Sequence, residues 1–209
     1  METVKVNKNA YSKGLRRALK AIENGGIIII PTETVYGIAA LASDKNAVRK
    51  IYEAKGRDFK KPLPLISSSV KGLKGWAVLG DRAKIVGESF WPGPLTMVVP
   101  KGKKTPDIVT AGKDKIAVRV PKHYFIKELI ESLGNPLVAT SANISGEEEP
   151  LQCSEINPLL LEKVSLCIDG GHTLYEQAST VIDMTQEQMP ILRPGPITGK
   201  QIVEALKNG

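Results

Sequence analysis

The sequence predicts a single α/β domain, residues 1–209, in which helices flank a twisted, mixed β-sheet. Three observations support this fold class. Helix-like and strand-like segments alternate through the first part of the chain, and strands dominate the later part. Hydrophobic residues make up 42% of the 209 residues, which is enough for one sizeable core. No internal repeat and no low-complexity linker divides the chain.

The first elements are predicted from periodicity and from the residues that end each run. Apolar residues recur at helical spacing over 11–22, and the Asn-Gly-Gly sequence that follows can end this helix in left-handed geometry. Four consecutive isoleucines at 27–30, bounded by a glycine and a proline, predict a buried strand. A second helix is expected to start at Ser43 or Asp44 and to stop at Gly56.

The remaining strands are predicted from short apolar runs at residues 63–66, 95–99, 116–120, 137–139, 164–168 and 179–182. Two further helices are expected, one at 125–133 that Gly134 closes and one at 197–206. The acidic segment 147–150 is expected to form an exposed and mobile loop.

Composition narrows the class of partner and compartment. The formal net charge is +7 and the isoelectric point is near 9.3, which favours anionic partners such as nucleotides, pyrophosphate or RNA. The cysteines are Cys153 and Cys167, and this sparse use favours a reducing cytosol over a disulfide scaffold. The polar N-terminus does not resemble a signal peptide, and no apolar run is long enough for a membrane span. A cytoplasmic protein without membrane contact is therefore expected.

Several familiar catalytic motifs are missing from the sequence. The segment 195–201 is similar to a P-loop, but its glycines are too close together and Gln201 stands where a hydroxyl residue should follow the lysine. No GxGxxG, GxSxG or HExxH motif occurs. His123 and His172 are far apart and no CxxC motif accompanies them, so neither a zinc site nor a histidine-based nucleophile is expected. An enzyme of this sequence would work by positioning and charge neutralisation.

Hydroxyl, carboxylate and amide side chains follow two predicted strands. The segment 31–37, PTETVYG, comes directly after the isoleucine strand, and ligands of open α/β sheets bind beyond strand ends. The segment 140–143, TSAN, follows the strand at 137–139. These groups could orient a polar substrate. From local chemistry, solvated threonines at a strand-to-loop junction would also explain the first segment, and an Asx turn or a cap would explain the second.

Cationic side chains form a second set of candidates. The segment 55–62, KGRDFKKP, holds four cations around a helix-ending glycine and before a proline, so they could converge on a triphosphate or form a solvated basic loop. Arg119 lies within an apolar strand, where it must pair with a ligand anion or with an internal acid. Arg193 stands at a predicted tight turn.

The sequence contains, in this order, the six blocks PTETVYG, KGRDFKKP, FWPGPLT, AVRVP, TSAN and LRPGP. Together they resemble the signature of the YrdC family of threonylcarbamoyl-adenylate synthases. The blocks extend from Pro31 to Pro196, so the resemblance covers most of the chain. It implies one twisted α/β domain around a concave, positively charged site. It also implies that L-threonine, bicarbonate and ATP are joined into threonylcarbamoyl-AMP with release of pyrophosphate, for threonylcarbamoyl-adenosine modification of tRNA.

The resemblance also assigns roles to residues of this chain, although none of them is an acid or base catalyst. The implied threonine contacts are Thr32, Arg119, Thr140 and Ser179. The implied ATP contacts are Lys55, Arg57, Lys61, Ser141, Asn143 and Arg193. Few acids lie near the motifs, so Mg²⁺ is expected to enter with ATP and to be held by phosphates and water. The product would pass to a tRNA threonylcarbamoyl-transferase machinery.

Two other functions compete with this one. A basic surface could belong to a non-catalytic module that binds tRNA or double-stranded RNA, although aromatics are only 5% and no RNP, KH or zinc-knuckle motif occurs. A carbamoyl-transfer domain of a larger enzyme is the other alternative. Lys101, Lys103 and Lys104 are expected to be exposed and free, which would allow weak, salt-dependent RNA binding beside the catalytic role.

Overall fold

The isoleucine run is buried on both faces, because helices cover both sides of the sheet that contains it. The structure, a computed structural model, describes residues 2–6 and 11–209. Ile28 and Ile30 pack in an apolar cluster with residues of helices α1 (Tyr11–Glu23) and α5 (Tyr124–Leu133). Ile27 and Ile29 pack in a second cluster with residues of α2 (Lys45–Lys55). Alternate strand residues point to opposite faces, so an unbroken apolar run marks a strand that is covered twice.

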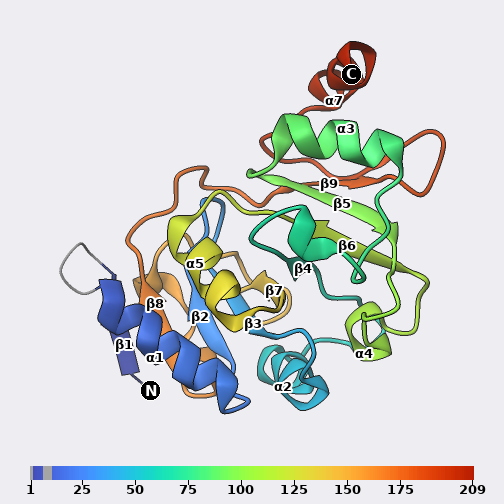
Figure 1. Cartoon of the computed structure of the whole chain (residues 1–209). Coiled ribbons are helices and arrows are strands. Elements are labelled where there is room, and N and C mark those ends of the chain that lie inside the picture. The colour runs from blue at the N-terminus through green and yellow to red at the C-terminus, as the bar shows by residue number, and fades with distance from the viewer. Residues whose placement is uncertain (1, 7–10) are drawn as a thin grey trace.

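In the described part of the chain, ten strands form one mixed sheet in the order β1-β8-β2-β3-β7-β4-β6-β5-β9-β10 (Figure 1). The strands are β1 Glu2–Lys5, β2 Ile28–Ile30, β3 Gly37–Leu41, β4 Leu65–Ile66, β5 Leu95–Pro100, β6 Lys115–Arg119, β7 Leu137–Ser141, β8 Leu166–Asp169, β9 Thr180–Asp183 and β10 Ile191–Arg193. Parallel pairs such as β4–β6 and β5–β9 adjoin antiparallel pairs such as β3–β7 and β5–β6. The predicted fold class, an α/β domain with a mixed sheet flanked by helices, is confirmed.

The helix ends follow the local signals. The Asp44 carboxylate accepts hydrogen bonds from the first amides of α2, and Gly56 ends this helix with φ +59°, as predicted. The last helix begins at Gly199, two residues later than predicted, because Thr198 and Gln201 form a capping box. The other helices are α3 Asp81–Phe90, α4 Asp107–Thr110 and α6 Pro158–Leu161, with α7 Gly199–Asn208 closing the chain. None of the described helices combines the length and the apolar character that crossing a membrane requires.

Six helices and strands had no counterpart in the sequence prediction, namely β1, β3, α3, α4, α6 and β10, and several predicted strand ends differ from the observed ones. The run at 63–66 gives a strand of only two residues, β4. Strand β7 extends through Thr140 to Ser141, because β3 pairs with it and brings Gly37 opposite Ser141. The partner strand β3 has the sequence Gly-Ile-Ala-Ala-Leu, which shows neither β-branched enrichment nor polar alternation.

Two expectations about exposed loops need correction. Within the acidic segment 147–150, Glu147 and Glu148 are exposed, but Glu149 is half-buried and Pro150 is buried. Lys103 and Lys104 are exposed as predicted. Lys101 is not free, because its ammonium forms an ion pair of 2.8 Å with Asp107 and its side chain is only 23% exposed.

Candidate functional site

A cavity of about 400 Å³ opens between segments that are far apart in the sequence. This volume lies within the range of about 300–1,000 Å³ that is common for small-molecule sites. The predicted site residues that line it are Thr32, Arg57, Arg119, Thr140, Ser141, Ser179 and Arg193. Seven of the ten candidates therefore share one cavity, while Lys55, Lys61 and Asn143 are not among the residues that line it.

The Thr32 hydroxyl organises the turn that follows β2. Its oxygen accepts hydrogen bonds from the amides of Thr34 and Val35, at 3.0 and 3.2 Å, and it lies 2.7 Å from the Val35 carbonyl oxygen, to which it donates. The Thr32 and Thr34 hydroxyl oxygens are 2.8 Å apart. The two hydroxyls therefore stabilise the local fold of this turn, and both threonines also line the cavity.

Arg119 is held in place by the buried carboxylate of Glu33, a residue of the PTETVYG segment that the sequence analysis did not pair with Arg119. Its Nη2 lies 2.8 Å from Glu33 Oε1, and the two residues are 7% and 5% exposed. The guanidinium also donates to the Gly93 carbonyl and to the Thr34 hydroxyl, at 3.1 and 2.9 Å. Glu33 Oε1 in turn accepts the Lys122 amide at 2.7 Å. Of the two alternatives for Arg119, the internal ion pair is present, and the same arginine also lines the cavity.

Lys55 is placed behind the cavity wall rather than on it. Its ammonium is buried and donates to the backbone carbonyls of Ser141 and Asn143, and to Asn143 Oδ1 at 3.1 Å. Burial, followed by the positive charge of Arg57, lowers the pKa of Lys55 to about 8. Asn143 also donates from Nδ2 to the Glu147 carbonyl at 2.7 Å. Lys55 and Asn143 thus fix the chain where β7 ends and Ser141 meets the cavity.

The basic segment after α2, residues 56–62, is held against the helix by contacts with Tyr52. The ring of Phe59 stacks on Tyr52 with centroids 4.6 Å apart, and the Tyr52 hydroxyl donates to the Lys61 carbonyl. Arg57 donates from Nη2 to the Pro62 carbonyl at 2.9 Å and lines the cavity. Burial lowers the pKa of Arg57, as expected for a cation that is partly removed from water. The side chain of Lys61 is exposed and lies outside the cavity lining.

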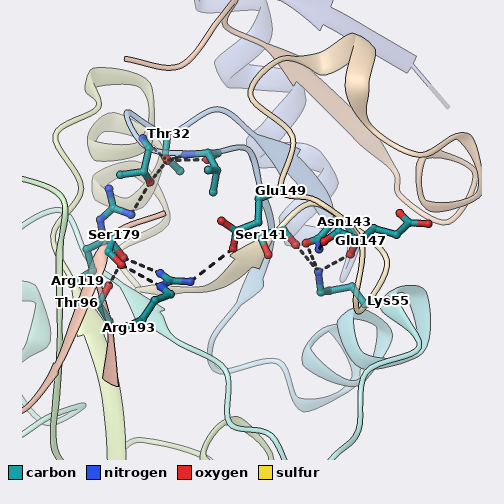
Figure 2. A network of polar contacts seen from close by, with 12 residues as sticks. Thr32, Lys55, Thr96, Arg119, Ser141, Asn143, Glu147, Glu149, Ser179 and Arg193 are labelled. Carbon is teal, nitrogen blue, oxygen red and sulfur yellow. Dashed lines mark hydrogen bonds and ion pairs between the residues drawn. The ribbon is translucent and has the colours of Figure 1, made fainter. Parts of the chain in front are cut away.

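Figure 2 shows Arg193 and Ser179 on one side of the site and Glu149 opposite. Arg193 donates from Nε to the Ser179 carbonyl at 3.0 Å and from Nη2 to the Ser179 hydroxyl at 3.1 Å. The Ser179 hydroxyl oxygen is 2.7 Å from that of Thr96, a cavity residue that the sequence prediction missed. The remaining nitrogen, Nη1, lies 3.6 Å from Glu149 Oε1. Glu149 was also missed, because nothing in the acidic run distinguishes it from its neighbours.

The site offers few ligands for a protein-bound metal. Among residues 2–6 and 11–209, no group of three or more histidine, cysteine, aspartate or glutamate side chains is arranged to hold a metal ion. Glu149 is the one carboxylate among the described residues that line the cavity. A magnesium ion that arrives with a nucleotide fits this donor set, since Mg²⁺ takes most of its oxygens from phosphates and water.

Comparison with known proteins decides the family. The family model of Sua5, YciO and YrdC proteins, described as "Telomere recombination", matches residues 20–195. The chain belongs to this family. It is 40% identical over 193 residues to a protein of Pyrococcus abyssi named threonylcarbamoyl-AMP synthase, and 36% identical over 190 residues to one of the same name from Bacillus subtilis. These alignments cover 92% and 90% of the chain but only 57% and 55% of the relatives, so the chain spans little more than half their length.

Solved structures agree with this assignment of the fold. The crystal structure of P. abyssi Sua5 complexed with L-threonine superposes with a TM-score of 0.91 and 38% sequence identity, over 98% of this chain and 60% of that chain. The crystal structure of E. coli YciO gives a TM-score of 0.85 and 25% identity, over 96% and 98% of the two chains. The resemblance of the six sequence blocks to this family is therefore confirmed.

Proposed function

We propose that this chain is an L-threonylcarbamoyladenylate synthase, which forms threonylcarbamoyl-AMP and pyrophosphate from L-threonine, bicarbonate and ATP. One observation carries the proposal. A single cavity is lined by the buried Arg119, by several hydroxyl side chains, and by Arg57 and Arg193, which are more exposed to solvent. Such a site suits a small amino acid and a polyphosphate side by side. Relatives at 40% and 36% identity bear the name of this synthase.

The amino-acid side of the site would be built on Arg119. Its guanidinium is oriented by Glu33, Thr34 and the Gly93 carbonyl before any ligand arrives, so no reorganisation is needed when an anion binds. The carboxylate or carbamate of threonine would be its partner. Hydroxyls of Thr32, Thr140 and Ser179 line the same cavity and would contact the substrate.

The nucleotide side would use Arg57 and Arg193 as the cations nearest the phosphates, with Ser141 beside them. Threonine and bicarbonate would first combine into the carbamate with loss of water. Attack of a carbamate oxygen on the α-phosphorus would then form the new P–O bond while the bond to pyrophosphate breaks. Both reactants are anionic, so the step needs charge screening and alignment more than proton transfer. Mg²⁺ bound to the phosphates would supply further screening.

Lys55 and Asn143 would serve the nucleotide indirectly, by holding the 141–143 backbone in place. Direct contact between Lys55 and a phosphate would require its ammonium to leave at least one carbonyl acceptor. Lys61 is exposed beside this region, where its charge could reach the phosphate tail only by reorientation. The product would pass to tRNA-modifying transferase machinery.

The decisive experiment is incubation of the protein with ATP, Mg²⁺, bicarbonate and L-threonine. Pyrophosphate release and a new adenylate of the mass of threonylcarbamoyl-AMP are expected, and both should need all the substrates. Pyrophosphate release that does not depend on threonine would contradict the proposal. So would binding of RNA with high sequence discrimination by a protein that forms no adenylate, which would favour the non-catalytic RNA module.

Substrate selectivity gives a second test. The hydroxyl groups around the cavity predict that threonine is preferred over serine, and that valine is the poorest substrate. A site that pairs a substrate hydroxyl is left with unpaired groups by valine, whereas a missing methyl costs only about 1–3 kcal/mol. The measurement is kcat/KM for adenylate formation with each amino acid. Equal values for valine and threonine would show that these hydroxyls do not recognise the substrate.

A further inference from the structure

The cavity contains one feature that its proposed chemistry does not use, an acid among cations. Arg57, Arg119 and Arg193 all line it, and Glu149 is the one acid among its described lining residues. A carboxylate placed here repels the phosphates and carboxylates that these arginines would bind. Glu149 therefore needs a role of its own in an anion-binding site.

The backbone on either side of Glu149 is anchored. The Pro150 carbonyl, which follows it, accepts the Tyr36 amide at 2.9 Å and Pro150 itself is buried. On the other side, Glu147 is held through its carbonyl by Asn143 and through its carboxylate by Asn157 at 2.8 Å. Glu149 extends from this anchored segment towards Arg193, as Figure 2 shows. Its place in the cavity is thus set by the fold rather than by a free loop.

The contact between Glu149 and Arg193 differs from the buried ion pair between Glu33 and Arg119. The distance from Arg193 Nη1 to Glu149 Oε1 is 3.6 Å, which is beyond ordinary hydrogen-bond length. The two side chains are 44% and 32% exposed, so water and ligands can reach both. Nε and Nη2 of Arg193 donate to Ser179, whereas Nη1 has only the loose contact with Glu149, so Nη1 is the nitrogen whose partner can be exchanged with least loss.

We propose that Glu149 is an internal competitor for anions at Arg193 and thereby sets the affinity of this subsite for phosphate groups. A bound pyrophosphate or nucleotide would take the place of the Glu149 carboxylate on Nη1. The affinity is lower than Arg193 alone would give, because a fraction of molecules has the nitrogen occupied. This inference rests on the proposed function in one respect, that the competing anion is a phosphate group.

The test is calorimetric titration with inorganic pyrophosphate in the presence of EDTA, so that no metal is involved. Glu149→Gln should bind pyrophosphate about twofold to fivefold more tightly than the wild type, the range expected from freeing a partly exposed ion pair. Glu148→Gln is the matched control, since it removes the same charge from an exposed neighbouring residue. It should change the affinity by less than about twofold. Unfolding in urea would verify that both variants are folded.

A second comparison locates the effect. In an Arg193→Gln background, Glu149→Gln should improve pyrophosphate binding clearly less than it does in the wild type, because the nitrogen it frees is gone and only the general repulsion by the carboxylate is relieved. Equal or weaker binding by Glu149→Gln, including no measurable binding by either protein, would overturn the proposal. Equal affinities of the two proteins in EDTA, with weaker binding of magnesium pyrophosphate by Glu149→Gln, would also overturn it, since Glu149 would then act as a metal ligand instead of a competitor. A wild type that shows these affinities but makes no adenylate would refute the proposed function alone.

Discussion

The two charged pairs of the cavity, Glu33–Arg119 and Glu149–Arg193, are built in opposite ways. The first is buried, 2.8 Å long and tied to the surrounding backbone through Gly93 and Lys122. The second is 3.6 Å long, and both its side chains are reached by solvent. Both arginines lie on the wall of the same cavity.

The difference shows how one site can combine fixed and exchangeable charges. Desolvation makes a buried charge dependent on its partner, so Arg119 cannot be separated from Glu33 without a large cost in stability. A solvent-exposed pair contributes little to stability, so Arg193 can change partners at small cost. We therefore expect substitutions of the buried cations to change stability, and substitutions of the open cations to change binding.

The largest effect is expected for Arg119→Ala. It leaves the Glu33 carboxylate buried without its counter-ion, which costs about 3–5 kcal/mol in the free energy of unfolding. Urea denaturation measures this directly. The double variant Glu33→Ala/Arg119→Ala should be less destabilised than the sum of the two single variants, because the unpaired charge is removed. Unchanged stability of Arg119→Ala, with activity lost, would show that the ion pair contributes nothing to the fold.

The buried Lys55 should reveal itself in the pH dependence of stability. Burial lowers its folded-state pKa from 10.5 to about 8, so between these values the unfolded chain binds the proton that the folded protein has lost. The free energy of unfolding should therefore rise with pH over this window, with a contribution from Lys55 of up to about 3 kcal/mol. Below pH 8 both states carry the proton and the contribution is flat. Lys55→Met should lose this rise in urea unfolding at pH 7.5 to 10, and identical slopes for both proteins would contradict the prediction.

At the solvent-exposed pair of Glu149 and Arg193, Arg193→Ala should weaken ATP binding by about tenfold, because one charged hydrogen bond is lost. The free energy of unfolding should change by less than about 1 kcal/mol. Calorimetry and urea unfolding on the same variant separate the two effects. Arg82→Ala is the control, since Arg82 is an exposed arginine outside the cavity lining that contacts the Glu187 carbonyl. A loss of stability without a loss of affinity would place Arg193 with the buried cations.

The smallest effect concerns the surface lysines. Lys101 is paired with Asp107, whereas Lys103 and Lys104 are exposed. Weak binding of tRNA should depend on salt, and Lys103→Ala/Lys104→Ala should reduce the slope of log affinity against log salt by up to about 2, at about 0.9 per phosphate contact. Lys101→Ala should reduce it less. Adenylate formation should be unchanged in both. A tRNA affinity that is independent of salt would contradict this view.

Signals between near neighbours in the sequence determined those elements that the sequence analysis predicted correctly, and most of the helix ends. Unbroken isoleucines indicate a strand covered on both faces, and a cap such as Asp44 or Gly56 bonds only to residues within about one helical turn. Strand β3 was missed because its small, uniformly apolar residues have no distinctive local pattern, and its pairing with β7 fixes it as a strand. The six sequence blocks likewise identified the family without any structure.

The tertiary structure alone decided which charges meet. Glu33 and Arg119 are 86 positions apart and become partners only because the sheet brings the turn after β2 beside the end of β6. Lys55 stood among cations that predicted a phosphate site, yet packing of α2 beside the end of β7 turned its ammonium onto carbonyl oxygens. The sequence shows only that a buried charge needs a partner. The strand order and the burial of each residue determine whether that partner is a ligand or another group of the protein.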